Sequence, residues 1–153
     1  MNYHGIQPTT FNNGEGIRTA LWVAGCNHHC KGCQNAYTWD EHGGQEFGKD
    51  AKEKLFRALD RTWCDGLTLT GGDPLFPASR EEITSLAREV KTRFPDKNIW
   101  VYTGYKYEEV QDLEVMQYID VLVDGRFVEE LADPSYKFAG STNQRIIRVK
   151  ERS

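Results

Sequence analysis

Short apolar segments recur along the chain, and four of them are followed by glycine or by Asp-Gly. These four predict buried strands, because their length and apolar character are typical of strands bounded by turn-forming residues. They cover residues 19–24, 67–70, 98–103 and 119–123. Residues 145–149 are a candidate for a further strand.

Between the strands, apolar residues recur at the spacing of amphipathic helices. One helix is predicted around residues 51–59, after the glycines at positions 43 and 44. A second is predicted to begin with a capping box, in which Ser79 and Glu82 each satisfy a backbone donor of the other, and to end before Pro95. A third is predicted over residues 107–117.

The alternation of strands and helices predicts one α/β domain over residues 1–153 with a mainly parallel, curved sheet. Four or five strand–helix units are too few for a full eightfold barrel, so we expect an incomplete βα barrel. Active sites of such folds lie at the carboxyl ends of the strands. We therefore expect the loops after the four strands to meet at one edge of the sheet.

The composition is that of an ordinary globular protein, with 39% hydrophobic and 27% charged residues. A net charge of −4 gives no electrostatic reason to expect binding to nucleic acid or to an anionic membrane. The chain begins with neither a cationic leader nor a long apolar run. We expect a cytoplasmic protein, whose thiols stay reduced and are available for metals or catalysis rather than disulfides.

Three of the four cysteines form a tight group after the first predicted strand. Cys26, Cys30 and Cys33 have the spacing C-x3-C-x2-C. Iron–sulfur cubanes are usually held by four cysteines, so three would leave one iron without a protein ligand. A catalytic metal site keeps such an open position, which a small chelating molecule can occupy.

This spacing after a strand resembles the radical S-adenosylmethionine superfamily. The resemblance implies a 4Fe-4S cluster on Cys26, Cys30 and Cys33, with S-adenosylmethionine bound to the open iron. One electron from the reduced cluster then cleaves S-adenosylmethionine and releases a 5'-deoxyadenosyl radical. The cofactors perform the difficult chemistry, so no side chain is expected to act as a catalytic acid or base.

The same resemblance implies which residues hold S-adenosylmethionine. The turn Gly71-Gly72-Asp73 stands where the superfamily binds the methionine amino group, with Asp73 as an anionic acceptor. Backbone groups of Gly32, Cys33 and Gln34 are expected to contact the adenine base. The superfamily often has an aromatic residue at the position of Gly32, so another ring must stack on adenine; Tyr37 and Trp39 are the candidates.

Further segments resemble the glycyl-radical activases, and among them those that act on anaerobic ribonucleoside-triphosphate reductase. These segments are residues 13–18, 38–39, 68–75, 99–105, 121–127 and 140–145; the first departs from the activase pattern at Asn13 and Glu15. The resemblance implies that the substrate is a glycine of the reductase and that flavodoxin or a similar protein donates the electron. Asp124 is expected either to end a strand or to contact the cofactor, and residues 143–145 to serve the cofactor or the partner surface.

Other functions fit part of the pattern. An activase of another glycyl-radical enzyme, such as pyruvate formate-lyase, or a small-molecule enzyme, such as 7-carboxy-7-deazaguanine synthase, would share the cluster. A zinc-binding interaction module would need His28, His29 or Cys64 as fourth ligand, but zinc motifs usually pair two ligand couples and no second couple is present. We expect the two histidines to be exposed loop residues or partners of the ligands, and Cys64 to be a small buried apolar residue.

Overall fold

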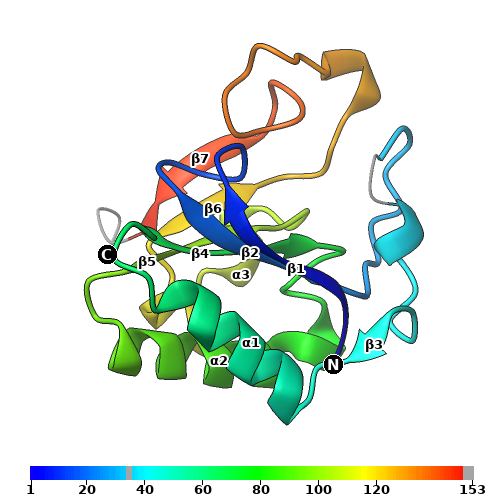
Figure 1. Ribbon diagram of the computed structural model, residues 1–153. Coiled ribbons are helices and arrows are strands. Elements are labelled where there is room, and N and C mark those ends of the chain that lie inside the picture. Colours follow the sequence, from blue (N-terminus) through cyan, green and yellow to red (C-terminus); the bar gives the residue numbers. More distant parts are fainter. Residues whose placement is uncertain (34–35, 150–153) are drawn as a thin grey trace.

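A seven-stranded mixed sheet forms the centre of the computed structural model, which describes residues 1–33 and 36–149 (Figure 1). The strands lie in the order β3-β1-β2-β4-β5-β6-β7. Their bounds are β1 Asn2–Thr10, β2 Arg18–Val23, β3 Gln45–Glu46, β4 Gly66–Gly71, β5 Asn98–Tyr102, β6 Val121–Asp124 and β7 Arg145–Arg148.

The four predicted strands are confirmed and form the parallel centre of the sheet. β2 pairs with β4, β4 with β5 and β5 with β6, all in parallel. The candidate fifth strand is β7, which runs antiparallel to β6 at the edge. The carboxyl ends of the four parallel strands therefore lie along one edge, as expected. The description of this sheet as an incomplete βα barrel stays a prediction.

Two strands were not predicted. β1 runs antiparallel to β2, with register shifts between Tyr3 and Gly5 and between Gln7 and Thr10. β3 pairs with β1 over two residues only. Most side chains of both strands are half-buried or exposed. Neither segment therefore needs an apolar run or a strict alternation of apolar and polar residues, and neither has one. Hydrophobic periodicity therefore gives no signal for them.

Helices α1 and α2 lie side by side below the sheet in Figure 1 and confirm the first two predicted helices. They cover Lys49–Leu59 and Arg80–Arg93. The predicted capping box of α2 is wrong: Ser79 ends a preceding 3-10 turn, and its side chain makes no capping hydrogen bond. Glu82 instead accepts a bond of 3.0 Å from the terminal ammonium of Met1.

The third predicted helix is interrupted. It consists of α3 Tyr107–Val110 and the 3-10 turn η3 Glu114–Gln117, with extended backbone at Leu113 between them. Val110, Val115 and Met116 are all buried. In one continuous helix these positions would point in widely separated directions, so the break is what lets all three reach the core. The other 3-10 turns are η1 Ala36–Thr38, η2 Pro77–Ser79 and η4 Glu129–Leu131.

The sheet has two different faces. One packs on α1 and α2 and carries the main core, to which β5 contributes Ile99 and Val101. Because successive strand residues point to opposite faces, Trp100 and Tyr102 lie on the other face, where they pack with Phe138. Segment 125–144 rises over this second face in Figure 1.

Candidate cluster and cofactor site

A cavity of about 540 Å³ lies where the carboxyl ends of the parallel strands meet segment 125–144. It confirms that the loops after β2, β4, β5 and β6 converge, since residues of all four line it. The structure brings most of the predicted site residues together in its wall: Cys26, Cys30, Cys33, Gly71, Gly72 and Asp73. Gln34 lies outside the described residues.

Backbone hydrogen bonds fix the path of the loop that carries the three cysteines, residues 26–33. At its start, Gly25 donates to the Thr38 carbonyl at 2.7 Å and Cys26 to the Trp39 carbonyl at 3.1 Å. Gly32 has φ of +76°, a left-handed conformation that glycine adopts without a steric cost. A larger side chain before Cys33 would strain this turn, which explains why no aromatic residue occupies the position.

The thiols of this loop are partly buried. Burial raises the pKa of the Cys26 thiol, opposed by hydrogen bonds from the backbone of His28 and His29. Burial also raises the pKa of Cys30, opposed first by a hydrogen bond from the backbone of Phe127. Without a metal these two sulfurs favour the neutral thiol, so a metal bound there would have to displace their protons.

The turn after β4 packs tightly against the start of the cysteine loop. Gly71 has φ of +114°, and a Cβ there would lie 2.5 Å from backbone atoms of Val23. A Cβ on Gly72 would lie 2.6 Å from the Gly25 carbonyl oxygen and 2.9 Å from that of Thr38. Both glycines are therefore required by close approach to backbone, which cannot yield as a side chain can.

Asp73 completes this turn with a carboxylate that is 2% exposed. Its oxygens accept hydrogen bonds from the Thr103 hydroxyl at 2.8 and 2.9 Å, the backbone N–H of Gly104 at 2.9 Å and that of Leu75 at 2.9 Å. His28 Nε2 lies 2.7 Å from Oδ2. A carboxylate offers about four acceptor positions, so these donors occupy them all.

His28 is more deeply placed than the sequence indicated. Its side chain is 3% exposed, and its Nδ1 lies 3.1 Å from Nε of Arg126. The only sequence signal for this role was its position inside the cysteine loop. Arg126 gave no such signal, because it reaches the loop from beyond the end of β6.

Two aromatic residues of the cavity wall carry polar atoms without a protein partner among the described residues. They are Nε1 of Trp39 and the hydroxyl of Tyr102, both buried. Trp39 also stacks on His29, with ring centroids 4.4 Å apart and planes at 12°. Tyr37 is 60% exposed and is absent from the described cavity wall. Buried unpartnered donors are costly, so this wall is suited to a polar ligand.

The residues at the ends of β6 and β7 hold the far side of the cavity. The buried Asp124 accepts from Nε of Arg145 at 3.0 Å and from the backbone of Tyr107 at 2.7 Å. Asn143 Nδ2 donates to the Arg126 carbonyl at 2.8 Å and Gln144 Nε2 to the Gly125 carbonyl at 3.0 Å. Gln144 and Gly125 line the cavity as well.

The candidates for a fourth zinc ligand have other contacts. His28 bonds to Asp73, and His29 stacks on Trp39. Cys64 is 3% exposed within the main core, where its sulfur lies 3.5 Å from the Thr19 hydroxyl. Across residues 1–33 and 36–149, no three Cys, His, Asp or Glu side chains are grouped to hold a single metal ion.

Comparison with known proteins identifies the family. A model of the 4Fe-4S single cluster domain matches residues 12–147. The chain is 48% identical to the anaerobic ribonucleoside-triphosphate reductase-activating protein of Enterobacteria phage T4, covering 95% of this chain and 93% of the phage protein. It is 44% identical to the protein of that name in Vibrio cholerae, over 97% and 98% of the two chains, and 43% identical to that of Escherichia coli K12, over 98% and 100%. The chain belongs to the family of anaerobic ribonucleoside-triphosphate reductase-activating proteins, and it has a 4Fe-4S single cluster domain.

Proposed function

We propose that this protein activates an anaerobic ribonucleoside-triphosphate reductase by generating a glycyl radical on it, using S-adenosylmethionine and a reduced 4Fe-4S cluster. The observation that carries the proposal is the convergence of Cys26, Cys30 and Cys33 on one cavity, in a chain whose full-length relatives bear the name of reductase activators. When bound, the two cofactors supply a deoxyadenosyl radical that removes a hydrogen atom from a glycine Cα.

The donor set of the cavity suits a cubane with one open iron. Three thiols provide three ligands, and the fourth iron is left for a small molecule. A cubane is larger than a single metal ion, so the cysteine sulfurs that bind a cubane lie farther apart than the ligands of one ion. The protein's part is to fix the three sulfurs, to orient S-adenosylmethionine and to exclude water from the radical.

The turn at residues 71–73 is proposed to take the methionine end of the cofactor. Because Asp73 already accepts from Thr103, Gly104, Leu75 and His28, its main contribution is to hold the turn and the cysteine loop together. The backbone carbonyls of the turn then remain the natural acceptors for the amino group.

Trp39 is proposed to contact the adenine base. It lines the cavity beside the cysteine loop, and its buried Nε1 has no partner among the described residues. Gly32 and Gln34 are proposed to contribute backbone hydrogen bonds to the base, with Gln34 outside the described residues. Tyr37 is less suited, because its ring packs edge-on against His4.

The partner is proposed to bring a glycine-bearing loop to the cavity. Cys26, Cys30 and Cys33 are all partly exposed, so a folded protein can approach the cluster from outside.

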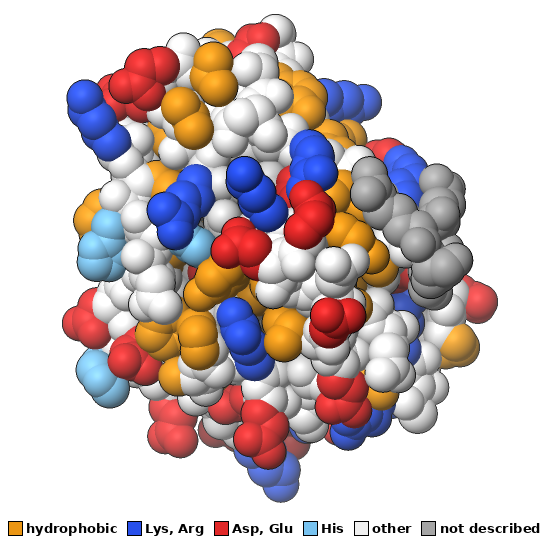
Figure 2. All heavy atoms as spheres, turned by 180° about the vertical axis from the view of Figure 1, so that it is seen from behind, with side chains coloured by type: hydrophobic (Ala, Val, Ile, Leu, Met, Phe, Trp, Pro, Cys, Tyr) orange, Lys and Arg blue, Asp and Glu red, His pale blue; other side chains and the backbone are white. Residues whose placement is uncertain are grey.

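On the rear surface in Figure 2, acidic and basic side chains are interspersed. No described helix is long and apolar enough to span a membrane. We propose a cytoplasmic protein that receives its electron from flavodoxin or a similar donor.

The formation of 5'-deoxyadenosine tests the enzymatic part of the proposal. We expect anaerobically reconstituted, reduced protein to be brown, to hold about four irons and to convert S-adenosylmethionine to 5'-deoxyadenosine. Cys30→Ala is expected to abolish both the iron and the product, whereas Cys64→Ala, whose thiol lies in the main core, is the matched control and retains both. A colourless wild-type protein that binds zinc instead would contradict the proposal.

A further inference from the structure

The ring of His28 joins two loops at the edge of the sheet. It projects from the cysteine loop after β2, and its Nε2 lies 2.7 Å from Oδ2 of Asp73 after β4. The ring also fits closely against the loop after β5, since a Cβ on Gly104 would lie 2.4 Å from it. The Tyr105 ring packs edge-on against the His28 ring, with the ring centroids 4.6 Å apart. The side chain is thus held on several sides.

Arg126 fixes which nitrogen of the ring carries the proton. A guanidinium can only donate, so Nδ1, 3.1 Å from Nε of Arg126, must accept. The proton therefore lies on Nε2, where it is donated to Asp73. This is the tautomer in which His28 bridges Arg126 and the carboxylate at the same time.

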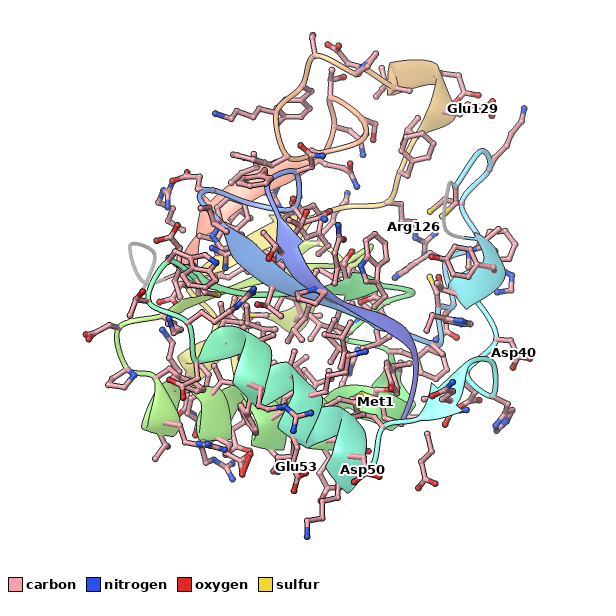
Figure 3. The ribbon with its side chains drawn as sticks, in the orientation of Figure 1. Met1, Asp40, Asp50, Glu53, Arg126 and Glu129 are labelled. Carbon is pink, nitrogen blue, oxygen red and sulfur yellow. The ribbon has the colours of Figure 1, made fainter. Side chains whose placement is uncertain are left out.

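Arg126 belongs to a segment, residues 125–129, that lies along the cysteine loop; we call it the strap. The backbone of Phe127 hydrogen bonds to Cys30, and a Cβ on Gly32 would lie 3.0 Å from the Glu129 side chain. Figure 3 shows Arg126 and Glu129 beside the loop. The strap itself is held by Asn143 and Gln144, which donate to the carbonyls of Arg126 and Gly125.

We propose that His28 is a positioning residue for the cluster: through Asp73 and Arg126 it latches the cysteine loop to the ends of β4 and β6. The inference rests on the proposed ligation by the three cysteines. His28 lies two residues from both Cys26 and Cys30, and its backbone hydrogen bonds to the Cys26 sulfur, so fixing His28 fixes the backbone between the two flanking sulfurs. The latch ties the cysteine loop to residues just beyond the ends of β4 and β6, and so holds the three sulfurs in place for the cluster.

The test is the rate at which the anaerobic holoprotein loses iron to a chelator. His28→Phe keeps a ring of similar size and removes both hydrogen bonds. We expect it to lose iron about 10–100 times faster, in line with the 10–100-fold loss of metal affinity that follows when a residue supporting a metal site is removed. His28→Gln places an amide donor near the position of Nε2 and is expected to recover most of the difference. His42→Phe, in an exposed histidine, is the matched control and leaves the rate unchanged.

Arg126→Met supplies a second variant, since Arg126 is exposed and its loss is not expected to unfold the chain. We expect it to speed iron loss less than His28→Phe, because the bond to Asp73 remains, and to broaden the electron paramagnetic resonance spectrum of the reduced cluster. Far-ultraviolet circular dichroism verifies folding. If His28→Phe does not fold, the rates of iron loss of Arg126→Met and His28→Gln test the inference.

When His28→Phe folds, either of two results would overturn the inference: a His28→Phe that loses iron within about twofold of the wild-type rate, or a His28→Gln no better than His28→Phe. If His28→Phe does not fold, a wild-type rate of iron loss in Arg126→Met overturns it. None of these measurements requires turnover. A wild-type protein that holds its cluster but forms no 5'-deoxyadenosine would contradict the proposed function and leave the latch standing.

Discussion

Nε2 of His28 and Oδ2 of Asp73 lie 2.7 Å apart, although the two residues are separated by 45 positions in the sequence. The bond joins the loop that carries the cysteines to the turn proposed to hold the cofactor. Both side chains are almost fully buried, with exposures of 3% and 2%. The two halves of the site are therefore positioned relative to each other by a direct contact.

Thr103→Val tests the support of this contact. The Thr103 hydroxyl donates to both oxygens of Asp73 at 2.8 and 2.9 Å, and valine keeps its shape. We expect the free energy of unfolding to fall by about 1–3 kcal/mol, because a buried carboxylate loses a donor. Urea denaturation measures the change. Thr92→Val, at an exposed helix position, is the control, and an equal loss there would contradict this explanation.

Gly72→Ala tests the close packing of the turn. The new methyl group would meet two carbonyl oxygens at 2.6 and 2.9 Å, so the turn and the cysteine loop must move apart. We expect loss of bound iron in reconstituted protein, measured as iron per chain. Gly5→Ala is the control, since no atom lies within 4 Å of the added Cβ. Full iron content in Gly72→Ala would show that iron binding does not need the close approach of Gly72 to these carbonyl oxygens.

Arg18→Met tests the opposite edge of the sheet. Arg18 is completely buried and donates to the Thr68 hydroxyl and to the Leu67 carbonyl at 2.7 and 2.8 Å. Burial lowers the pKa of its guanidinium to about 10, so at neutral pH the group stays charged. We expect a loss of roughly 1–3 kcal/mol for each acceptor left without a partner, measured by urea denaturation.

The matched control is the exposed Arg57→Met, which is expected to change stability by less than about 0.5 kcal/mol. Arg18 donates to backbone carbonyls at the amino ends of the strands, away from the cysteine loop. Iron content per folded molecule should therefore be unchanged in Arg18→Met. A normal stability in this variant would contradict the structural role.

Alkylation of the cluster-free protein tests the state of the thiols. Burial raises the pKa of Cys26 and of Cys30 above the ordinary 9.0. Because only the thiolate reacts, the rate with iodoacetamide should rise with pH and reach half its maximum above pH 9.0 at both residues. Mass spectrometry of labelled peptides gives each rate. A midpoint below that of free cysteine would contradict the expected direction.

The sequence predicts the framework of the site because that framework follows local rules. Short apolar runs identify β2, β4, β5 and β6, and parallel strands place their following loops at one edge. The cysteine spacing then marks the loop that is proposed to bind the cluster. The polar strand β1 has no such pattern, and the break between α3 and η3 depends on which residues the core can accept.

The contacts within the site could not be predicted in the same way. Arg126 meets His28 across 98 positions of the sequence, and neither residue type nor spacing indicates the pair. Asp73 was expected to receive an ammonium group, yet in the structure its oxygens accept from four protein donors. Such pairings depend on how the loops fold over the sheet edge, which only the tertiary structure defines.

The most direct test of the proposed function is electron paramagnetic resonance of the reductase after activation. Reconstituted protein, S-adenosylmethionine, a reductant and an anaerobic ribonucleoside-triphosphate reductase are mixed without oxygen. We predict a glycyl-radical doublet on the reductase that is absent with Cys30→Ala and present with Cys64→Ala. If the protein forms 5'-deoxyadenosine but no doublet on this reductase, and instead produces one on pyruvate formate-lyase, the assignment of the partner is contradicted.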